Sequence, residues 1–129
     1  MNFLVRTYRR WAERGARLAV GIALPLAFVM AMLPDAPGPE FSQGDKLVHT
    51  LVFLLLTLLA RIGWATRMAW WGWPLILLGY GVAIELAQAM LPWREASLLD
   101  WLADLAGVLV AKAVIGWQDR TAGAVVSKS

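Results

Sequence analysis

The chain has 129 residues, of which 60% are hydrophobic and only 16% are charged, and it contains no cysteine. Soluble domains carry roughly 45–50% apolar and about 25% charged residues, and a short chain buries a smaller share of its apolar surface than a long one. The composition therefore excludes a soluble globular domain, and the missing cysteines exclude a disulfide framework or a thiolate metal site. We expect a single membrane domain, residues 1–129, built as an all-α bundle of four transmembrane helices.

The first span is predicted at residues 17–33, where an apolar stretch ends before Pro34. A basic arm, residues 1–16, precedes it, and the first seventeen residues hold five arginines: Arg6, Arg9, Arg10, Arg14 and Arg17. A nucleic-acid arm is one reading of such a run. Because the run abuts an apolar span, a membrane-flanking anchor is favoured and no nucleic-acid partner is expected. An uncleaved span is favoured over a signal peptide, since no Ala-x-Ala site is well placed after Met32.

Three further spans are predicted at residues 46–64, 68–91 and 98–117. Proline and glycine residues interrupt the helix before the second span, and Pro92 ends the third. Tryptophans near the entry to the third span suit an aromatic belt at the membrane interface. The polar tail, residues 118–129, is expected to be flexible.

The orientation follows from basic residues in the short loops. Beyond the N-terminal arm, they gather in the turn after the second span and in the tail, as Arg61, Arg67, Arg120 and Lys128. Lys112 can extend toward the same side. Both termini are therefore expected in the bacterial cytoplasm, with loops 35–45 and 92–97 outside the cytoplasmic (inner) membrane.

Ionisable residues inside the predicted spans are the most informative feature of the sequence. Each costs ~2.5–3.5 kcal/mol at the centre of a span, so such residues are paired or functional. At a rise of ~1.5 Å per residue, His49 lies ~6 Å, Asp104 ~9 Å and Glu85 ~10 Å from the outward end of its span. Three helices thus bring ionisable groups to a similar depth. Gly81 and Gly107 lie on the same helix faces, where small residues allow close helix approach.

These residues occur in an ordered pattern: Asp45-Lys46-x-x-His49, then Glu85-x-x-Gln88, then Pro92-x-Arg94-x-x-Ser97-x-x-Asp100-x-x-x-Asp104-x-x-Gly107. The pattern resembles the VanZ-like membrane proteins, over about half of the chain from Asp45 to Ala111. The family usually has Asn where this chain has Asp104, and often Gly where it has Ala111. The first departure adds a potential negative charge to the site.

The resemblance implies a role in the cell envelope at the outer face, since the family is linked to resistance to the lipid-tailed glycopeptide teicoplanin. We expect a polar pocket that binds a membrane lipid, a lipid-linked precursor or a lipophilic antibiotic. Lys46 and Arg94 at its rim would hold an anion; the alternative is ordinary pairing of these cations with neighbouring carboxylates. The full set of expected ligand-binding residues is Asp45, Lys46, His49, Glu85, Gln88, Arg94, Asp100 and Asp104.

Two alternatives stay open. The first is an enzyme, a hydrolase or transferase on a lipid-linked phosphate, with His49, Glu85 and Asp104 as candidate acid–base residues. The second is a structural or assembly subunit, in which His49 only hydrogen-bonds Glu85 or Asp104 and locks helices together. Formation of a homo-oligomer is compatible with each of these readings.

Two other chemistries are weaker. Ser97 as a nucleophile competes with Ser97 as the N-cap of the fourth span, with Asp100 at the third position of that helix, and the cap is favoured. A metal site formed by His49, Glu85, Asp100 and Asp104 is conceivable, because one histidine with several carboxylates suits a divalent metal ion. No His-Glu-x-x-His or other two-histidine pattern supports one, so no metal and no cofactor are expected.

Overall fold

A computed structural model of the chain describes residues 2–34, 44–64 and 69–126. They form four helices, α1 (Asn2–Met32), α2 (Gly44–Trp64), α3 (Gly72–Ala89) and α4 (Leu98–Val126), and the described residues contain no strand. The predicted all-α class is confirmed. Three helices, α1 from Val5 onward, α2 and α3, are long and apolar enough to cross a membrane. The fourth helix is long as well, but charged residues interrupt its apolar sequence.

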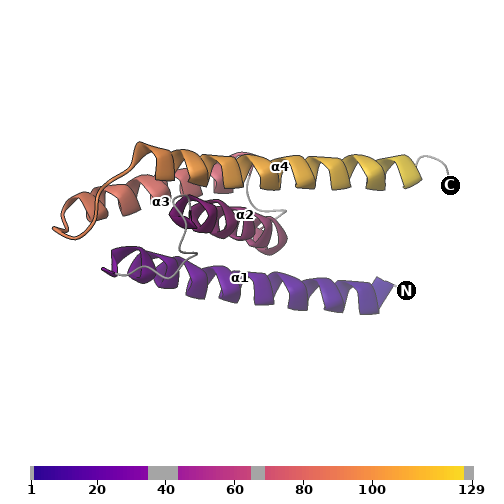
Figure 1. The fold of residues 1–129 in the computed structure, drawn as a ribbon. Coiled ribbons are helices and arrows are strands. Elements are labelled where there is room, and N and C mark those ends of the chain that lie inside the picture. Colours follow the sequence, from indigo (N-terminus) through magenta and orange to yellow (C-terminus); the bar gives the residue numbers. More distant parts are fainter. Residues whose placement is uncertain (1, 35–43, 65–68, 127–129) are drawn as a thin grey trace.

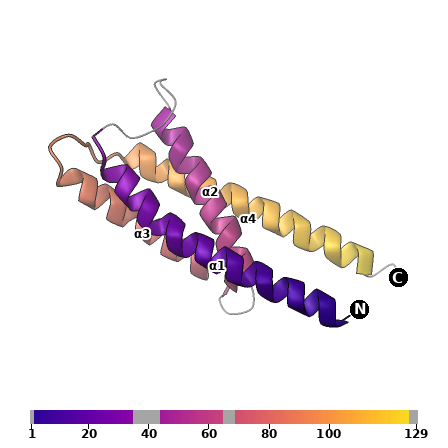
Figure 2. The same ribbon diagram turned by 90° about the horizontal axis from the view of Figure 1, so that it is seen from below.

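The helices form an elongated bundle in which α2 is central (Figure 1). It lies between α1 and α4 and also contacts α3, whereas α1 and α4 do not contact each other within the described residues. The start of α1 and the end of α4 lie at the same end of the bundle (Figures 1 and 2). A small apolar core joins α2, α3 and α4 through Phe53, Leu56, Leu77, Ile84 and Val108.

The outer surface of the bundle is apolar. Four large hydrophobic side chains along α1 are 55–68% exposed: Leu18, Ile22, Leu26 and Val29. Contiguous exposed apolar surface of this kind is rare on soluble monomers. Hydrocarbon tails of a bilayer solvate such side chains without cost, and this agrees with three helices of membrane-spanning length.

The helix boundaries agree with the sequence in part. The predicted second and fourth spans begin within two residues of α2 and α4, whereas α3 ends at Ala89, two residues earlier than expected. The predicted start of the third span at residue 68, and most of the outward loop 35–45, lie outside the described residues. The basic arm is part of α1 from Asn2 onward.

The expectation of a flexible tail from residue 118 is wrong as far as Val126, because α4 continues to that residue. Asp119 pairs with Arg61 of α2 at 3.3 Å, which holds the extension against the bundle. Only residues 127–129 of the expected tail lie outside the described part of the chain.

The closest approach of two helices is that of α2 and α4. A Cβ atom on Gly107 would overlap the carbonyl oxygen of Thr50 and would lie 2.9 Å from the amide nitrogen of Leu54. The Thr50 hydroxyl donates a hydrogen bond to the carbonyl oxygen of Ala103 at 3.2 Å. Ala111, one turn further along α4, is fully buried. Small residues on α4 thus let the two backbones touch.

Replacing Gly107 with Ala should therefore destabilise the bundle by about 1–3 kcal/mol, the usual cost of overpacking a filled interface. The matched control is Gly116→Ala on the same helix, where nothing lies within 4 Å of the added Cβ. That change should be neutral or slightly stabilising, because Ala favours helix. Thermal unfolding of the purified protein in detergent measures both, and equal midpoints would contradict this account of the α2–α4 contact.

Candidate functional site

A histidine and an aspartate from two helices form the centre of the site. The Nδ1 atom of His49 on α2 lies 2.8 Å from Oδ1 of Asp104 on α4. Asp104 is fully buried and the His49 side chain is only 12% exposed. The tight α2–α4 contact one turn further along places these two side chains within hydrogen-bond distance.

The third helix closes over Asp104. A Cβ atom on Gly81 of α3 would lie 2.6 Å from Oδ2 of Asp104, so only glycine leaves room for the carboxylate here. The indole nitrogen of Trp101 donates to the carbonyl oxygen of Leu78 at 3.2 Å, which ties α4 to the same stretch of α3. Gly81 is therefore part of the site, as a space for the carboxylate.

Ser97 caps the start of α4, and Glu85 of α3 holds Ser97 in place. Ser97 Oγ accepts a hydrogen bond from the amide of Asp100 at 3.3 Å, which confirms the predicted N-cap. The amide of Ser97 itself donates to Oε2 of Glu85 at 2.6 Å. In a capping box this second bond comes from a residue of the same helix; here it comes from α3. Asp100 is thus free to make other contacts.

Asp100 is turned toward α2 and is buried. Lys46 Nζ lies 3.4 Å from Oδ1 of Asp100 and 3.1 Å from Oδ2 of its own neighbour, Asp45. Asp45 is half exposed. Lys46 therefore pairs with neighbouring carboxylates, which is one of the two alternatives that the sequence left open for this residue.

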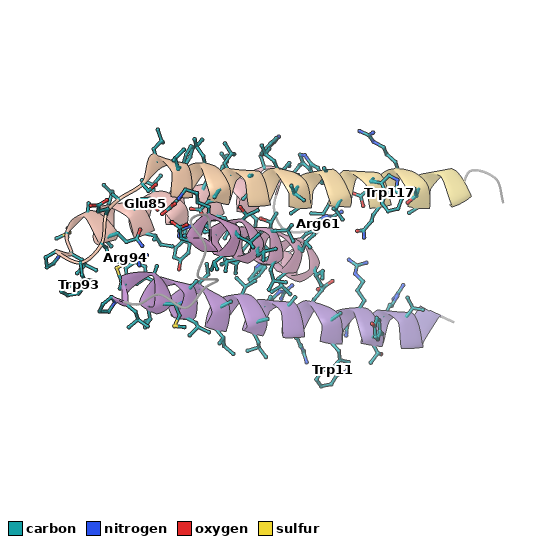
Figure 3. All side chains as sticks on the ribbon, viewed as in Figure 1. Trp11, Arg61, Glu85, Trp93, Arg94 and Trp117 are labelled. Atoms are coloured by element: carbon teal, nitrogen blue, oxygen red, sulfur yellow. The ribbon has the colours of Figure 1, made fainter. Side chains whose placement is uncertain are left out.

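Two expected binding residues lie apart from the central pair. Gln88 is fully buried, and its amide nitrogen donates to the carbonyl oxygen of Ala31 on α1 at 3.0 Å, so it joins α3 to α1. Arg94 is half-buried in the turn between α3 and α4, at the same end of the bundle as Glu85 and Trp93 (Figure 3). It forms no ion pair with any residue of the described ranges.

The sequence predicted that three helices would bring His49, Glu85 and Asp104 to one depth, and in the structure His49 and Asp104 are in direct contact. A ring nitrogen of His49 and one carboxylate oxygen each of Glu85 and Asp100 lie within 4.8 Å of one another. We call His49, Glu85, Asp100 and Asp104 the polar layer. The roles of these residues in binding or catalysis stay predictions.

The polar layer is closely packed. The two best-formed cavities among the described residues lie elsewhere, at the opposite end of α2 and along the start of α1. A pocket between the helices at the polar layer, as the sequence suggested, is therefore not among them. The reason is that Gly81 and Gly107 let the three backbones close around Asp104.

A cavity of about 240 Å³ lies at the other end of α2, and the sequence did not predict it. Its lining includes Arg61, Trp73 and Lys112. Lys112 is 8% exposed, donates to the carbonyl oxygen of Trp70 at 3.0 Å, and lies 3.7 and 3.6 Å from the ring centroids of Trp70 and Trp71. Lys112 thus reaches the turn before α3, on the side that the sequence predicted for it, and cation–π contact with these rings holds it inside the bundle. The run of tryptophans was the only signal for this contact.

Comparisons of the chain with protein-family models, with curated proteins and with solved structures give no match.

The buried pair gives a direct test. Asp104→Val removes the partner of His49 and should destabilise the protein by about 3–5 kcal/mol, as expected when one member of a buried pair is lost. Asp104→Asn keeps an acceptor oxygen of the same shape and should cost much less. The matched control, Asp119→Asn, breaks an exposed pair and should cost under about 1 kcal/mol. Thermal unfolding in detergent ranks the three variants; similar losses for Val and Asn would contradict a structural role for the hydrogen bond.

Proposed function

We propose that this chain is an integral protein of the bacterial cytoplasmic membrane with four spans and with both termini in the cytoplasm. The main support concerns α4. Its charged residues Asp100, Asp104 and Lys112 are buried inside the bundle. Its exposed large side chains are apolar along most of its length, as Leu102, Leu109, Val110 and Val114. A helix of 29 residues with an apolar outer face is long enough to cross ~30 Å of hydrocarbon.

The distribution of basic residues supports the orientation. Four arginines lie in the first half of α1 (Arg6, Arg9, Arg10 and Arg14), and Arg61 lies in the last turn of α2, toward the end where α1 begins and α4 ends (Figure 3). Basic loops stay in the cytoplasm. Tryptophans mark both ends: Trp93 at one, Trp11 and Trp117 toward the other (Figure 3). Amphipathic rings of this kind are enriched at both membrane interfaces.

Because the chain has no cysteine, single cysteines report its topology cleanly. Glu95→Cys in the α3–α4 turn should react with a membrane-impermeant maleimide on intact spheroplasts. Gln118→Cys near the other end of α4 should react only after permeabilisation. Both positions are exposed, so access to the reagent depends on the side of the membrane. Labelling of both from the same side would show that α4 does not span.

We further propose that the chain acts as a VanZ-like protein that binds the anionic group of an envelope lipid, a lipid-linked precursor or a lipophilic glycopeptide such as teicoplanin. One observation carries this proposal: Arg94 is half-buried at the proposed outer end without an ion pair among the described residues. A guanidinium offers a planar set of donors that matches phosphate and carboxylate.

The contacts around Arg94 favour binding at the rim over binding between the helices. The neighbouring Trp93 donates to the carbonyl oxygen of Met32 at the end of α1, so the turn that carries Arg94 is fixed to two helices. Lys46 is shared by Asp45 and Asp100 and therefore contributes less to an anion site. An apolar tail would lie along the exposed outer faces of the helices.

Native mass spectrometry of the full chain, released from mild detergent, tests this proposal. The wild type should retain a phosphate-bearing lipid, or bind added teicoplanin, and the two probes separate lipid from antibiotic. Arg94→Gln should lose most of the bound species, whereas the control Arg120→Gln at the other end should keep it. A bare wild-type protein that also ignores teicoplanin, or equal retention by both variants, would contradict the proposal.

The enzyme alternative is favoured by one observation, the 2.8 Å contact between His49 and Asp104, which is the geometry of an acid–base pair. The same mass spectra distinguish it from binding. An enzyme with His49→Gln would keep its lipid and stop converting it, whereas a binding protein shows no conversion in either form.

A further inference from the structure

We propose that the polar layer binds one divalent metal ion, with His49, Glu85 and Asp100 as ligands and with Asp104 orienting the histidine. The three ligands come from three different helices. One donor atom of each lies within 4.8 Å of the other two. Three donors around one ion, at metal–ligand bonds of ~2.0–2.2 Å, lie about 3.3–3.6 Å apart in a tetrahedral site. Movements of about one ångström, within reach of side-chain rotation, would close the three donors on an ion.

Unsatisfied oxygen atoms provide independent support. Oε1 of Glu85, Oδ1 of Asp100 and Oδ2 of Asp104 are buried and accept no hydrogen bond from the described residues. Asp100 Oδ1 has only Lys46 Nζ within ion-pair distance, at 3.4 Å. Buried polar atoms nearly always have partners, and an unpaired one points to an unobserved water or ion. The oxygens of Glu85 and Asp100 belong to two of the three proposed ligands, and their lack of a hydrogen-bond donor points to a cation.

The hydrogen bonds already present leave suitable atoms free. Glu85 uses Oε2 to accept the amide of Ser97, so Oε1 remains for a metal. When Asp104 is ionised it has only acceptors, so in the proposed site His49 would donate from Nδ1 to Asp104 and keep a lone pair on Nε2 for the metal. A metal-binding histidine commonly donates its other nitrogen to a carboxylate in this way, which fixes the ring.

The charges of the layer also favour a cation. Three carboxylates (Glu85, Asp100 and Asp104) face one lysine, Lys46, and one histidine within a largely apolar bundle. Burying like charges without compensation is strongly unfavourable. Lys46 is also shared with Asp45, so it leaves negative charge in the layer that a divalent ion would offset when His49 is neutral. The small, closed layer suits an ion better than a lipid headgroup.

The donor set indicates the class of metal. One imidazole with carboxylates, and no sulfur, suits Zn²⁺ or Mn²⁺ better than Cu⁺. Three protein ligands leave at least one position for water or for an oxygen of a ligand. Metal binding at the polar layer does not require lipid binding at Arg94. A protein that binds metal without lipid, or lipid without metal, would distinguish the two proposals.

The test uses the full chain in detergent. It carries no histidine tag, because the histidines of a tag would bind metal themselves, whereas the chain has a single histidine. After treatment with a chelator, the protein is titrated with Zn²⁺ or Mn²⁺, desalted and measured for metal by elemental analysis and for thermal unfolding. The wild type should retain about one ion of at least one of the two metals per chain and unfold at a higher temperature with it, since a ligand of the folded state stabilises that state.

Glu85→Gln and Asp100→Asn each remove one ligand charge and should weaken binding at least tenfold, and Asp104→Asn should weaken it about tenfold through the histidine. Glu95→Gln, which removes an exposed carboxylate close by, is the matched control and should bind as the wild type does. No retention of either ion by the wild type, or equal retention by all variants, would overturn the proposal. If the ligand variants do not fold, the visible spectrum of Co²⁺ added to the wild type decides. Bands of a histidine–carboxylate site support the proposal, and the spectrum of the aqueous ion overturns it.

Discussion

The close contact of α2 with α4 at Gly107 is the constraint on which the rest of the structure depends. With a side chain at that position, the carbonyl of Thr50 could not touch α4. A wider spacing would pull Asp104 away from His49, and a fully buried carboxylate would then lose its only hydrogen bond from the described residues. Since such a loss costs several kcal/mol, the glycine on α4 and the hydrogen-bonded pair one turn away are coupled features of one interface.

The placement of charge explains how a chain so rich in apolar residues holds several carboxylates. Lipid solvates the outer faces of the helices, so apolar burial contributes less to the association of helices than in water. Polar contacts inside the bundle therefore specify which helix lies beside which. The cap that Glu85 of α3 supplies to Ser97 at the start of α4 is one such contact. Gln88 does the same for α3 and α1, through the carbonyl of Ala31.

Much of this was predictable from the sequence, for identifiable reasons. Helical rise alone placed His49, Glu85 and Asp104 at one depth, and the spacing of Ser97 and Asp100 predicted the cap. What the sequence could not give was the rotation of each helix about its axis. That rotation sends Gln88 toward α1 and places Lys112 under Trp70, and only the packing of several helices determines it. The sequence did not predict that α4 continues beyond residue 117, because the polar residues there indicated a flexible tail. In the structure, Arg61 pairs with Asp119 in this segment.

The proposed metal ligands illustrate the same limitation. The sequence offered one histidine with several carboxylates as a possible set, but sequence rules recognise metal ligands by their spacing on one helix or loop, and here each ligand comes from a different helix. Three helices must first meet, and the meeting depends on Gly81 and Gly107, which bear no functional group at all. Their small size closes the layer to a headgroup while leaving the carboxylate oxygens unpaired. The chemistry of the layer and that of Arg94 at the rim are therefore separable: the first suits a small cation, and the second suits an anion that stays outside the bundle.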